Sequence, residues 1–368
     1  MNTYPHNSIV SWIAVTCFFA LTLNVSAASY SFNGAVDNDY KKAGNWSGSV
    51  IPDTANGDTA VISNGAAVTY DPTSTPAGDY TISNGGTLQV TNGSWTQITG
   101  GAWIQLGAGG AGGNGHILVN GGSFSQGTAG NNPFNISGTG NTFTITSGSA
   151  AFTSQVNAVT GITWNIAGGS TSMSAGPLNV QSGGNVLVSA GTLTLGGNLV
   201  LENGSTWTQT GGTVTLGSGA EFDFNSLSGS SMSGGTLNVD KLITGVNGSL
   251  GSTFGFSGGT INIGATAFSG MYGADNGNHP FNFTLGSLGV INFLNGNTSV
   301  SDVNGWLAAG GILYNNTTAP SAFLVSQAGG PGTTVSLSLV AAVPEPASYA
   351  CLMGGVAAIA AVIYRRRR

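Results

Sequence analysis

A short unit of the form Gly-Gly-Thr-apolar-polar-apolar recurs along the middle of the chain and constrains the fold more than any other feature. Strict copies occupy residues 85–90, 211–216, 234–239 and 258–263, and looser copies occupy 121–126, 183–188 and 190–195. The glycines at 191, 212, 235 and 259 follow one another at intervals of 21, 23 and 24 residues. Alternating residues point to opposite faces of a strand, and paired glycines allow the positive φ that tight corners need. A period in the low twenties built from such strands predicts stacked coils.

Composition agrees with a β fold. Glycine supplies 62 of 368 residues, and glycine is unfavourable inside helices. The predicted fold class is therefore all-β, with a right-handed parallel β-helix (a β-solenoid) as its body. About 300 residues at about 22 per coil would make about 13 coils. A β-sandwich is the competing architecture.

The few charged residues exclude nucleic-acid binding. The chain has 7 basic and 13 acidic residues, and all four arginines are the last four residues, Arg365, Arg366, Arg367 and Arg368. The body therefore has no basic patch with which to neutralise phosphates. The two cysteines, Cys17 and Cys351, lie in apolar terminal stretches, so we expect no disulfide and no thiolate metal site in the body.

The N-terminus has the features of an export signal. Residues 9–23 form an uninterrupted apolar run, and small residues follow it up to Ala27 and Ala28. This order predicts a signal peptide over residues 1–27, cleaved after Ala27 or Ala28. The stretch before the apolar run lacks Lys and Arg, which leaves a buried N-terminal strand as the alternative.

The C-terminus combines a short motif, an apolar run and a basic end. Val343, Pro344, Glu345 and Pro346 precede an apolar stretch at 349–364, and the four arginines follow it directly. The stretch predicts one membrane span, and the arginines predict that this end stays in the cytoplasm. The exported body would then lie outside the cytoplasm.

This arrangement over residues 343–368 resembles the PEP-CTERM sorting signal of Gram-negative bacteria. The resemblance implies an exosortase-type processing protease as partner, and a membrane helix that holds the protein only until processing. It also implies a final place at the cell surface or in the matrix of bacteria that make exopolysaccharide.

The body divides into three predicted regions. Residues 28–80, with Trp46, Pro52 and Gly65, resemble the opening stretch of exported planctomycete and verrucomicrobial β-helix proteins, some of them related to autotransporter-associated β-strand repeats. This resemblance implies an N-terminal cap, with Trp46 covering the end of the core. We expect solenoid repeats over 81–267, and a C-terminal cap or small β region over 268–342, where the repeat fades.

Catalytic residues are scarce in the body. Glu221 and Asp223 would share one face of a strand, as a glycosidase pair requires, although two solvated side chains fit the same pattern. A β-helix lyase typically needs a basic residue, and Lys241 is the only one beyond the cap region. We expect no catalytic site, and a carbohydrate-active lyase or hydrolase is kept as an alternative.

Metal and cofactor sites are not predicted either. His116 and His279 are the only histidines of the body and lie far apart in sequence. Asp37 and Asp39 begin like a calcium loop, but the sixth position, which needs glycine, is Lys42. We expect no metal and no cofactor.

Aromatic and hydroxyl side chains provide the remaining candidates. Trp95 and Trp207 occupy equivalent positions in a longer duplication, where they would either stack on sugar rings or pack in the core. Thr-x-Thr pairs do not recur at one fixed position of the repeat, so we expect a generic hydroxyl surface from Thr142/Thr144/Thr146, Thr192/Thr194 and Thr213/Thr215. An ice-binding protein would need a flat, regular threonine array.

Together these features predict an exported cell-surface or extracellular-matrix protein with a structural or adhesive role, associated with exopolysaccharide. The alternatives are a carbohydrate-active β-helix enzyme and an ice- or surface-adsorbing protein.

Overall fold

The computed structural model describes residues 27–340, except for 57, 64–65, 71–79, 98–103, 108–113, 127–133, 137, 154–155, 159–160, 175, 182, 203, 225–228, 245–252, 265–280, 295, 297 and 330–332. Several sequence predictions lie outside these residues: the apolar run at 9–23, the motif at 343–346, the span at 349–364, the arginines at 365–368, and His279.

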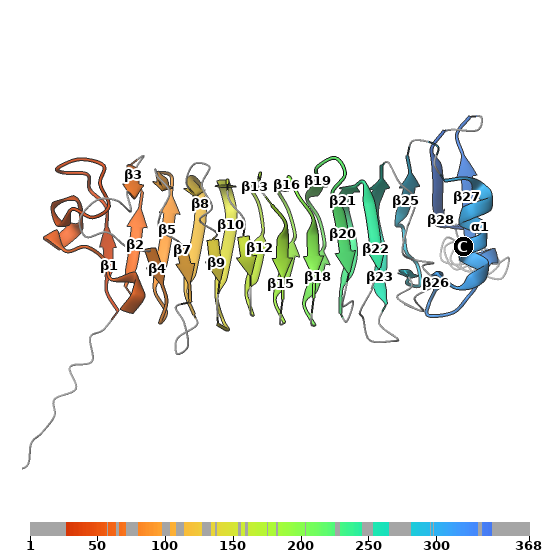
Figure 1. Ribbon diagram of the computed structural model, residues 1–368, viewed down its shortest axis with the longest axis horizontal. Coiled ribbons are helices and arrows are strands. Elements are labelled where there is room, and N and C mark those ends of the chain that lie inside the picture. The colour runs from red at the N-terminus through yellow and green to blue at the C-terminus, as the bar shows by residue number, and fades with distance from the viewer. Residues whose placement is uncertain are drawn as a thin grey trace, which may run out of the picture.

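The described residues form an elongated stack of coils, with β1 near one end and helix α1 (Val300–Ala309) at the other (Figure 1). The strands belong to a 20-stranded sheet and an 8-stranded sheet. Their bounds are β1 (Ser29–Ser31), β2 (Thr59–Ile62), β3 (Ala67–Tyr70), β4 (Tyr80–Ile82), β5 (Thr87–Thr91), β6 (Ser94–Gln97), β7 (Ile104–Leu106), β8 (His116–Gln126), β9 (Phe134–Ile136), β10 (Thr142–Phe152), β11 (Val156–Ala158), β12 (Thr163–Ile166), β13 (Ser170–Met173), β14 (Leu178–Val180), β15 (Asn185–Val188), β16 (Thr192–Leu195), β17 (Leu199–Leu201), β18 (Thr206–Gln209), β19 (Thr213–Leu216), β20 (Glu221–Phe224), β21 (Ser231–Val239), β22 (Lys241–Thr244), β23 (Phe254–Ile263), β24 (Phe281–Phe283), β25 (Val290–Phe293), β26 (Ile312–Tyr314), β27 (Phe323–Gln327) and β28 (Val335–Leu339).

Successive coils stack in parallel and form three ladders, which we call the first, second and third faces. The first face runs through β1, β2, β5, the first halves of β8 and β10, β12, β15, β18, the starts of β21 and β23, β24 and β26. The second face runs through β3, β6, the second halves of β8 and β10, β13, β16, β19, the ends of β21 and β23, and β25. The third face is the 8-stranded sheet of β4, β7, β9, β11, β14, β17, β20 and β22. The predicted all-β solenoid is confirmed.

The coils are less uniform than the sequence period suggested. Within the described residues the first face runs through twelve strands and the third face through eight, whereas the repeat length predicted about 13 coils. Ser94 pairs with Ser123, 29 residues on, whereas Thr192 pairs with Thr213, 21 residues on. The copy of the repeat unit at 85–90 lies on the first face, and the copy at 211–216 lies on the second. The unit therefore marks two kinds of corner, which explains its irregular gaps.

The corner before the second face requires glycine because the coils approach closely there. Gly212 has φ +65°, and a Cβ on it would lie 2.7 Å from the carbonyl oxygen of Gly191 in the preceding coil. Gly235 has φ +78°, and its Cβ would lie 2.4 Å from the carbonyl oxygen of Gly211. A positive φ and a backbone contact together exclude any side chain at these positions.

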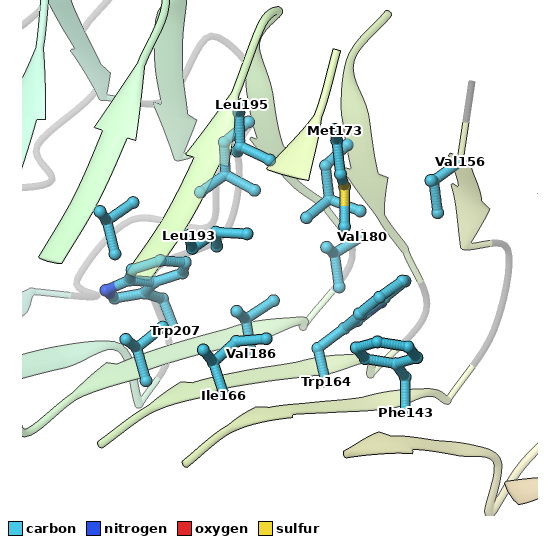
Figure 2. Close-up of a cluster of buried hydrophobic side chains, with 14 of the residues drawn as sticks. Phe143, Val156, Trp164, Ile166, Met173, Val180, Val186, Leu193, Leu195 and Trp207 are labelled. Carbon is cyan, nitrogen blue, oxygen red and sulfur yellow. The ribbon is translucent and has the colours of Figure 1, made fainter. Parts of the chain in front are cut away.

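Alternation fills the interior with apolar side chains. On the first face Phe143 pairs with Trp164, and their rings lie 4.8 Å apart between centroids. Trp207 continues this row further along the stack and contacts Phe222 of the third face at 5.1 Å. Figure 2 shows how residues of the different faces meet in one core. Since each coil buries its own apolar residues against the coils above and below, no helix is needed to cover the sheets.

An irregular segment with three short 3₁₀ helices, Ala43–Asn45, Ser47–Ser49 and Thr54–Asn56, covers the N-terminal end of the stack. Trp46 is buried there between Phe32 and Tyr40, with ring centroids 5.1 and 4.9 Å away, and its Nε1 donates to the carbonyl of Tyr40 at 2.7 Å. Within the predicted cap region of 28–80, β2, β3 and β4 already pair with the next coil.

The C-terminal end departs from the solenoid pattern. Parallel pairing continues beyond residue 267 through β24, β25 and β26, until β28 pairs antiparallel with β25 and with β27. Helix α1 begins at a capping box between Ser299 and Asp302 and ends at Gly310 in the left-handed conformation. Val303 and Leu307 bury its inner side, and Trp306 contacts Phe293. The antiparallel pairing and the helix end the parallel stack, as a terminal cap of a solenoid does.

Candidate binding face

The outer surface of the second face carries two columns of small side chains, which are polar except for Ala151 between β6 and β23. From β6 to β23 the first outward position forms the hydroxyl column, which consists of Ser94, Ser123, Ser149, Ser170, Thr192, Thr213, Thr236 and Thr260. Ala67 of β3 and Val290 of β25 occupy this position at the two ends of the face. The third position forms the hydroxyl–amide column, which consists of Thr69, Thr96, Ser125, Ala151, Ser172, Thr194, Thr215, Asn238, Asn262 and Asn292. Neither column contains a charged or aromatic residue.

Strand geometry fixes the spacing of this array. Neighbouring strands of a sheet lie about 4.8 Å apart, and alternate residues of one strand lie about 6.6 Å apart. Thr192 and Thr194 are exposed, and Thr213 and Thr215 above them are partly shielded by their neighbours. The result is a two-dimensional lattice of hydroxyl groups on one side of the rod.

The Thr-x-Thr pairs do not all share one position, as the sequence analysis expected. Thr192 pairs with Thr213 and Thr194 with Thr215, in the two columns of the second face. Thr142 and Thr144 belong instead to the first face. Local sequence does not reveal this alignment, because the coil length varies between the pairs.

Toward the C-terminal end, hydrogen bonds link the hydroxyl–amide column into a ladder. The Nδ2 of Asn238 donates to Thr215 Oγ1 at 3.2 Å, Asn262 Nδ2 donates to Asn238 Oδ1 at 2.8 Å, and Asn292 Nδ2 donates to Asn262 Oδ1 at 2.9 Å. Ser336 Oγ closes the ladder by donating to Asn292 Oδ1 at 2.8 Å. Each amide nitrogen has two protons, so one from each rung is not used by the ladder contact. The ladder holds these amides in a fixed row.

The first face is less regular than the second, because only one of its two outer columns is polar throughout. Its third-position column includes Val61, Leu118 and Leu187 between polar residues, and Leu187 is 36% exposed. The other column is polar, and it consists of Ser29, Thr59, Thr87, His116, Thr142, Thr163, Asn185 and Thr206. His116 is its one large member, and the Nδ1 of His116 lies 2.8 Å from Thr142 Oγ1. Partial burial lowers the pKa of His116 below its usual value. The first face therefore combines one polar column with one column of mixed polarity and size.

The third face carries the predicted carboxylate pair. Glu221 and Asp223 are partly exposed on β20, and Phe222 between them is buried. Glu221 forms an ion pair with Lys241, its partner in the next strand, with a distance of 2.9 Å between Oε1 and Nζ. The carboxylate of Glu221 and the lysine beyond the cap region therefore bind each other across neighbouring rungs.

The proposal that Trp95 and Trp207 stack on sugars is wrong. Both side chains have 0% exposed surface, because they stand at inward positions of their strands. Trp95 stacks on Phe124 with 5.0 Å between ring centroids and 5° between ring planes. In the structure the two tryptophans are core residues, which was the other interpretation of their repeated position.

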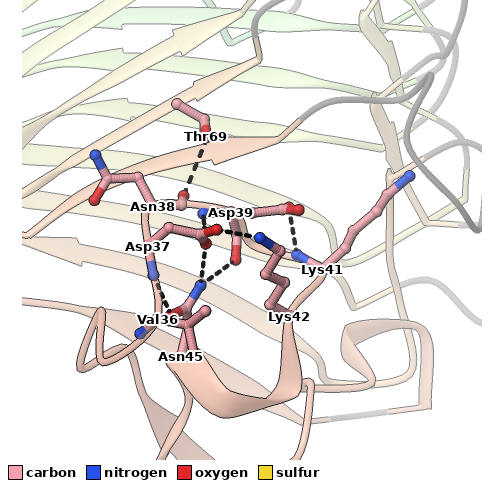
Figure 3. A network of polar contacts seen from close by, with 8 residues as sticks. All are labelled: Val36, Asp37, Asn38, Asp39, Lys41, Lys42, Asn45 and Thr69. Carbon is pink, nitrogen blue, oxygen red and sulfur yellow. Dashed lines mark hydrogen bonds and ion pairs between the residues drawn. The ribbon is translucent and has the colours of Figure 1, made fainter.

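Aspartates near the N-terminus stabilise the cap segment (Figure 3). Asn45 is buried; its Nδ2 donates to Asp37 Oδ1 and to the carbonyl of Asp39, both at 2.8 Å, and its Oδ1 accepts from the backbone N–H of Val36. The ion pair with Lys42, the backbone N–H of Asp39 and the Asn45 amide lower the pKa of Asp37 to about 2. Lys42, at the position where a calcium loop needs glycine, contacts the carboxylate itself.

Among the described residues, no group of three or more His, Cys, Asp or Glu side chains is placed to hold a metal ion. None of the helices in the described part of the chain has both the length and the hydropathy of a membrane span.

Comparisons with family models, with curated proteins and with solved structures gave no match to this chain. The candidate site therefore depends on its own geometry.

Sequence reasoning missed the serines of the hydroxyl column. Ser94, Ser123, Ser149 and Ser170 extend the threonine rows over four further coils. The signal in the sequence was weak: each of these serines directly follows a glycine, but so do many other residues of this glycine-rich chain.

Proposed function

We propose that the protein is an exported structural or adhesion protein of the cell surface or extracellular matrix, and that its second face binds polysaccharide without catalysis. The observation that carries the proposal is the hydroxyl column, which continues over eight strands beside the hydroxyl–amide column. A polysaccharide chain presents hydroxyl groups in rows, and a face of regularly spaced donors and acceptors is complementary to it.

The affinity of such a face for a polymer depends on the number of contacts that are made at the same time. A single hydrogen bond contributes about 0.5–1.5 kcal/mol net, because each partner also leaves water. Contacts along one polymer add through the high effective concentration of each following site. Because neither column carries charge, we expect binding to a neutral polysaccharide to change little with salt concentration.

Export and sorting belong to the same proposal. The leader ends at Ala27 or Ala28, an exosortase-type protease recognises the motif at 343–346, and the apolar stretch holds the chain in the membrane until processing. We also propose that the coil is right-handed, since parallel crossover connections nearly always are.

The test is binding to the exopolysaccharide of the producing organism, with released chain ends measured in the same sample. Thr194→Lys places a bulky cation in the middle of the second face, and we expect it to lower affinity several-fold. Thr208→Lys is the matched control, because Thr208 occupies the same third position on the first face, one coil further along. Equal binding by both variants and the original chain would contradict the proposal. Release of chain ends would instead support an enzyme and make Glu221 and Asp223 the next residues to change.

A second candidate is adsorption to ice or to another crystalline surface. It is favoured by the block in which Ser170/Ser172, Thr192/Thr194 and Thr213/Thr215 repeat at the same two positions in three successive coils. Ice recrystallisation is the measurement. Inhibition that Thr194→Lys removes and Thr208→Lys retains would favour this function over polysaccharide binding.

A further inference from the structure

The C-terminal end of the stack exposes large apolar side chains. Leu285 is 75% exposed and Leu288 is 87% exposed, and they border a hollow of about 510 Å³ that is also lined by Tyr314, Leu339 and Val340. Leu324, 53% exposed, pairs with Ser338 of the same hollow. Exposed apolar side chains gathered on one surface commonly mark a contact with another protein or with a membrane.

The two leucines are held by a well-defined turn. Ser287 N–H donates to the carbonyl of Thr284 at 3.0 Å, Gly286 between them has φ +76°, and Leu288 N–H donates to the carbonyl of Ser257 in the preceding coil at 3.1 Å. We call Leu285 and Leu288 the leucine corner. The turn fixes the backbone from which these two side chains protrude, although the side chains contribute little to the core.

The same corner in preceding coils has no large side chain. Between the first and second faces, the two coils before it turn through Ser233–Gly235 and Ser257–Gly259. Only at the last such corner before the cap do leucines replace serine and glycine. Because the coils turn without leucine elsewhere, the turn itself does not explain them.

We propose that the leucine corner and the adjoining hollow rest on the surface of a lipid bilayer, so that the C-terminal end of the rod faces the membrane. This inference rests on the membrane anchoring in the proposed function. Val340 lines the hollow and is the last described residue, and the apolar stretch begins at residue 349. Eight residues extend over at most about 29 Å, so an anchored chain keeps this end close to the bilayer.

The scarcity of charged side chains at this end of the rod agrees with contact to a bilayer. Beyond Lys241, Asp302 is the one charged side chain in the described part of the chain, and it is occupied in the capping box with Ser299. An uncharged surface with protruding leucines enters the interfacial region of a bilayer without burying a charge. We therefore expect contact with neutral phosphatidylcholine, unaffected by salt.

The experiment uses the full chain in phosphatidylcholine vesicles, with Cys17→Ser and Cys351→Ser as background. Leu288→Cys carries an environment-sensitive fluorophore, and Val36→Cys is the control, since Val36 is an exposed apolar residue (62%) at the opposite end. We expect lipids with a quencher in the acyl chains to quench the label at position 288 several-fold more than the label at position 36.

The outcomes separate this inference from the anchoring on which it rests. A chain that does not float with the vesicles overturns both. A chain that floats, with both labels equally unquenched, keeps the anchor and overturns the lipid contact. A blue shift at position 288 that needs no lipid and grows with protein concentration assigns the hollow to a second copy of the chain and also overturns the proposal.

Discussion

The first and second faces are built from the same coils, with the same parallel pairing and apolar interiors. Only the second face lacks large apolar residues in both of its outer columns from β6 to β23; the first face has Val61, Leu118 and Leu187 in one of its two columns. Thr194 is preceded and followed in its column by Ser172 and Thr215, whereas Thr208 of the first face lies between Leu187 and Ser231. Both faces stack equally well in register.

The difference indicates that the solenoid does not need an ordered exterior. A column that mixes valine, leucine, glutamine and threonine is sufficient to stack the first face. Since packing acts on the inward side chains, the two adjacent columns of small side chains on the second face require another explanation, and binding to a repetitive partner provides one.

The largest loss of stability is expected from a change in the core behind the first face, at Trp207, whose side chain serves packing alone. Trp207→Ala removes a fully buried ring that contacts Phe222 and should lower the free energy of unfolding by about 3–5 kcal/mol. Urea denaturation measures this loss. Trp207→Phe is the control, and we expect it to bind polysaccharide as the original chain does. Unchanged stability with lost binding in Trp207→Ala would restore the sugar-stacking interpretation.

A smaller difference in stability is expected between two corners of one coil, the corner before the first face and the corner before the second face. Gly204, before the first face, has φ +77° and open space where a methyl group would lie, whereas a methyl group on Gly212, before the second face, meets the backbone of the preceding coil. Gly204→Ala should cost about 1–2 kcal/mol from the left-handed backbone alone. Gly212→Ala adds a steric overlap and should cost about 3 kcal/mol or more. Equal urea midpoints would show that the coils can move apart at this corner.

The sequence predicted the fold class well because its main signals are local. Alternation and paired glycines specify strands and corners, and these determine a solenoid wherever they recur. Register is different: the same Gly-Gly-Thr unit begins β5 on the first face and β19 on the second, so which residues share a column depends on the full length of each coil.

The sequence also could not assign a role to residues whose chemistry suits two different sites. Trp95 and Trp207 suit a core and a sugar site equally, and only their inward position decides between them. Helix α1 was missed within the predicted C-terminal cap or β region, although Ser299 and Asp302 form a capping box three residues apart. Gly305 in its interior weakens the helical pattern, and packing of Val303 and Leu307 compensates for it.

The smallest change in stability is expected from substitutions at the outer surfaces of the two faces, and it tests the difference between these faces most directly. Thr194→Ala and Thr208→Ala remove one outward hydroxyl group and its methyl group from the second and the first face, respectively. If the regular exterior does not serve stability, both changes should alter the free energy of unfolding by at most about 0.5 kcal/mol, as is usual for surface positions. Thermal and urea denaturation of the two variants check this. Only Thr194→Ala should weaken polysaccharide binding, because it alone interrupts the columns. A clear loss of stability for Thr194→Ala, with none for Thr208→Ala, would show that the ordered hydroxyl groups hold the coils together. The regularity of the second face would then need no partner to explain it.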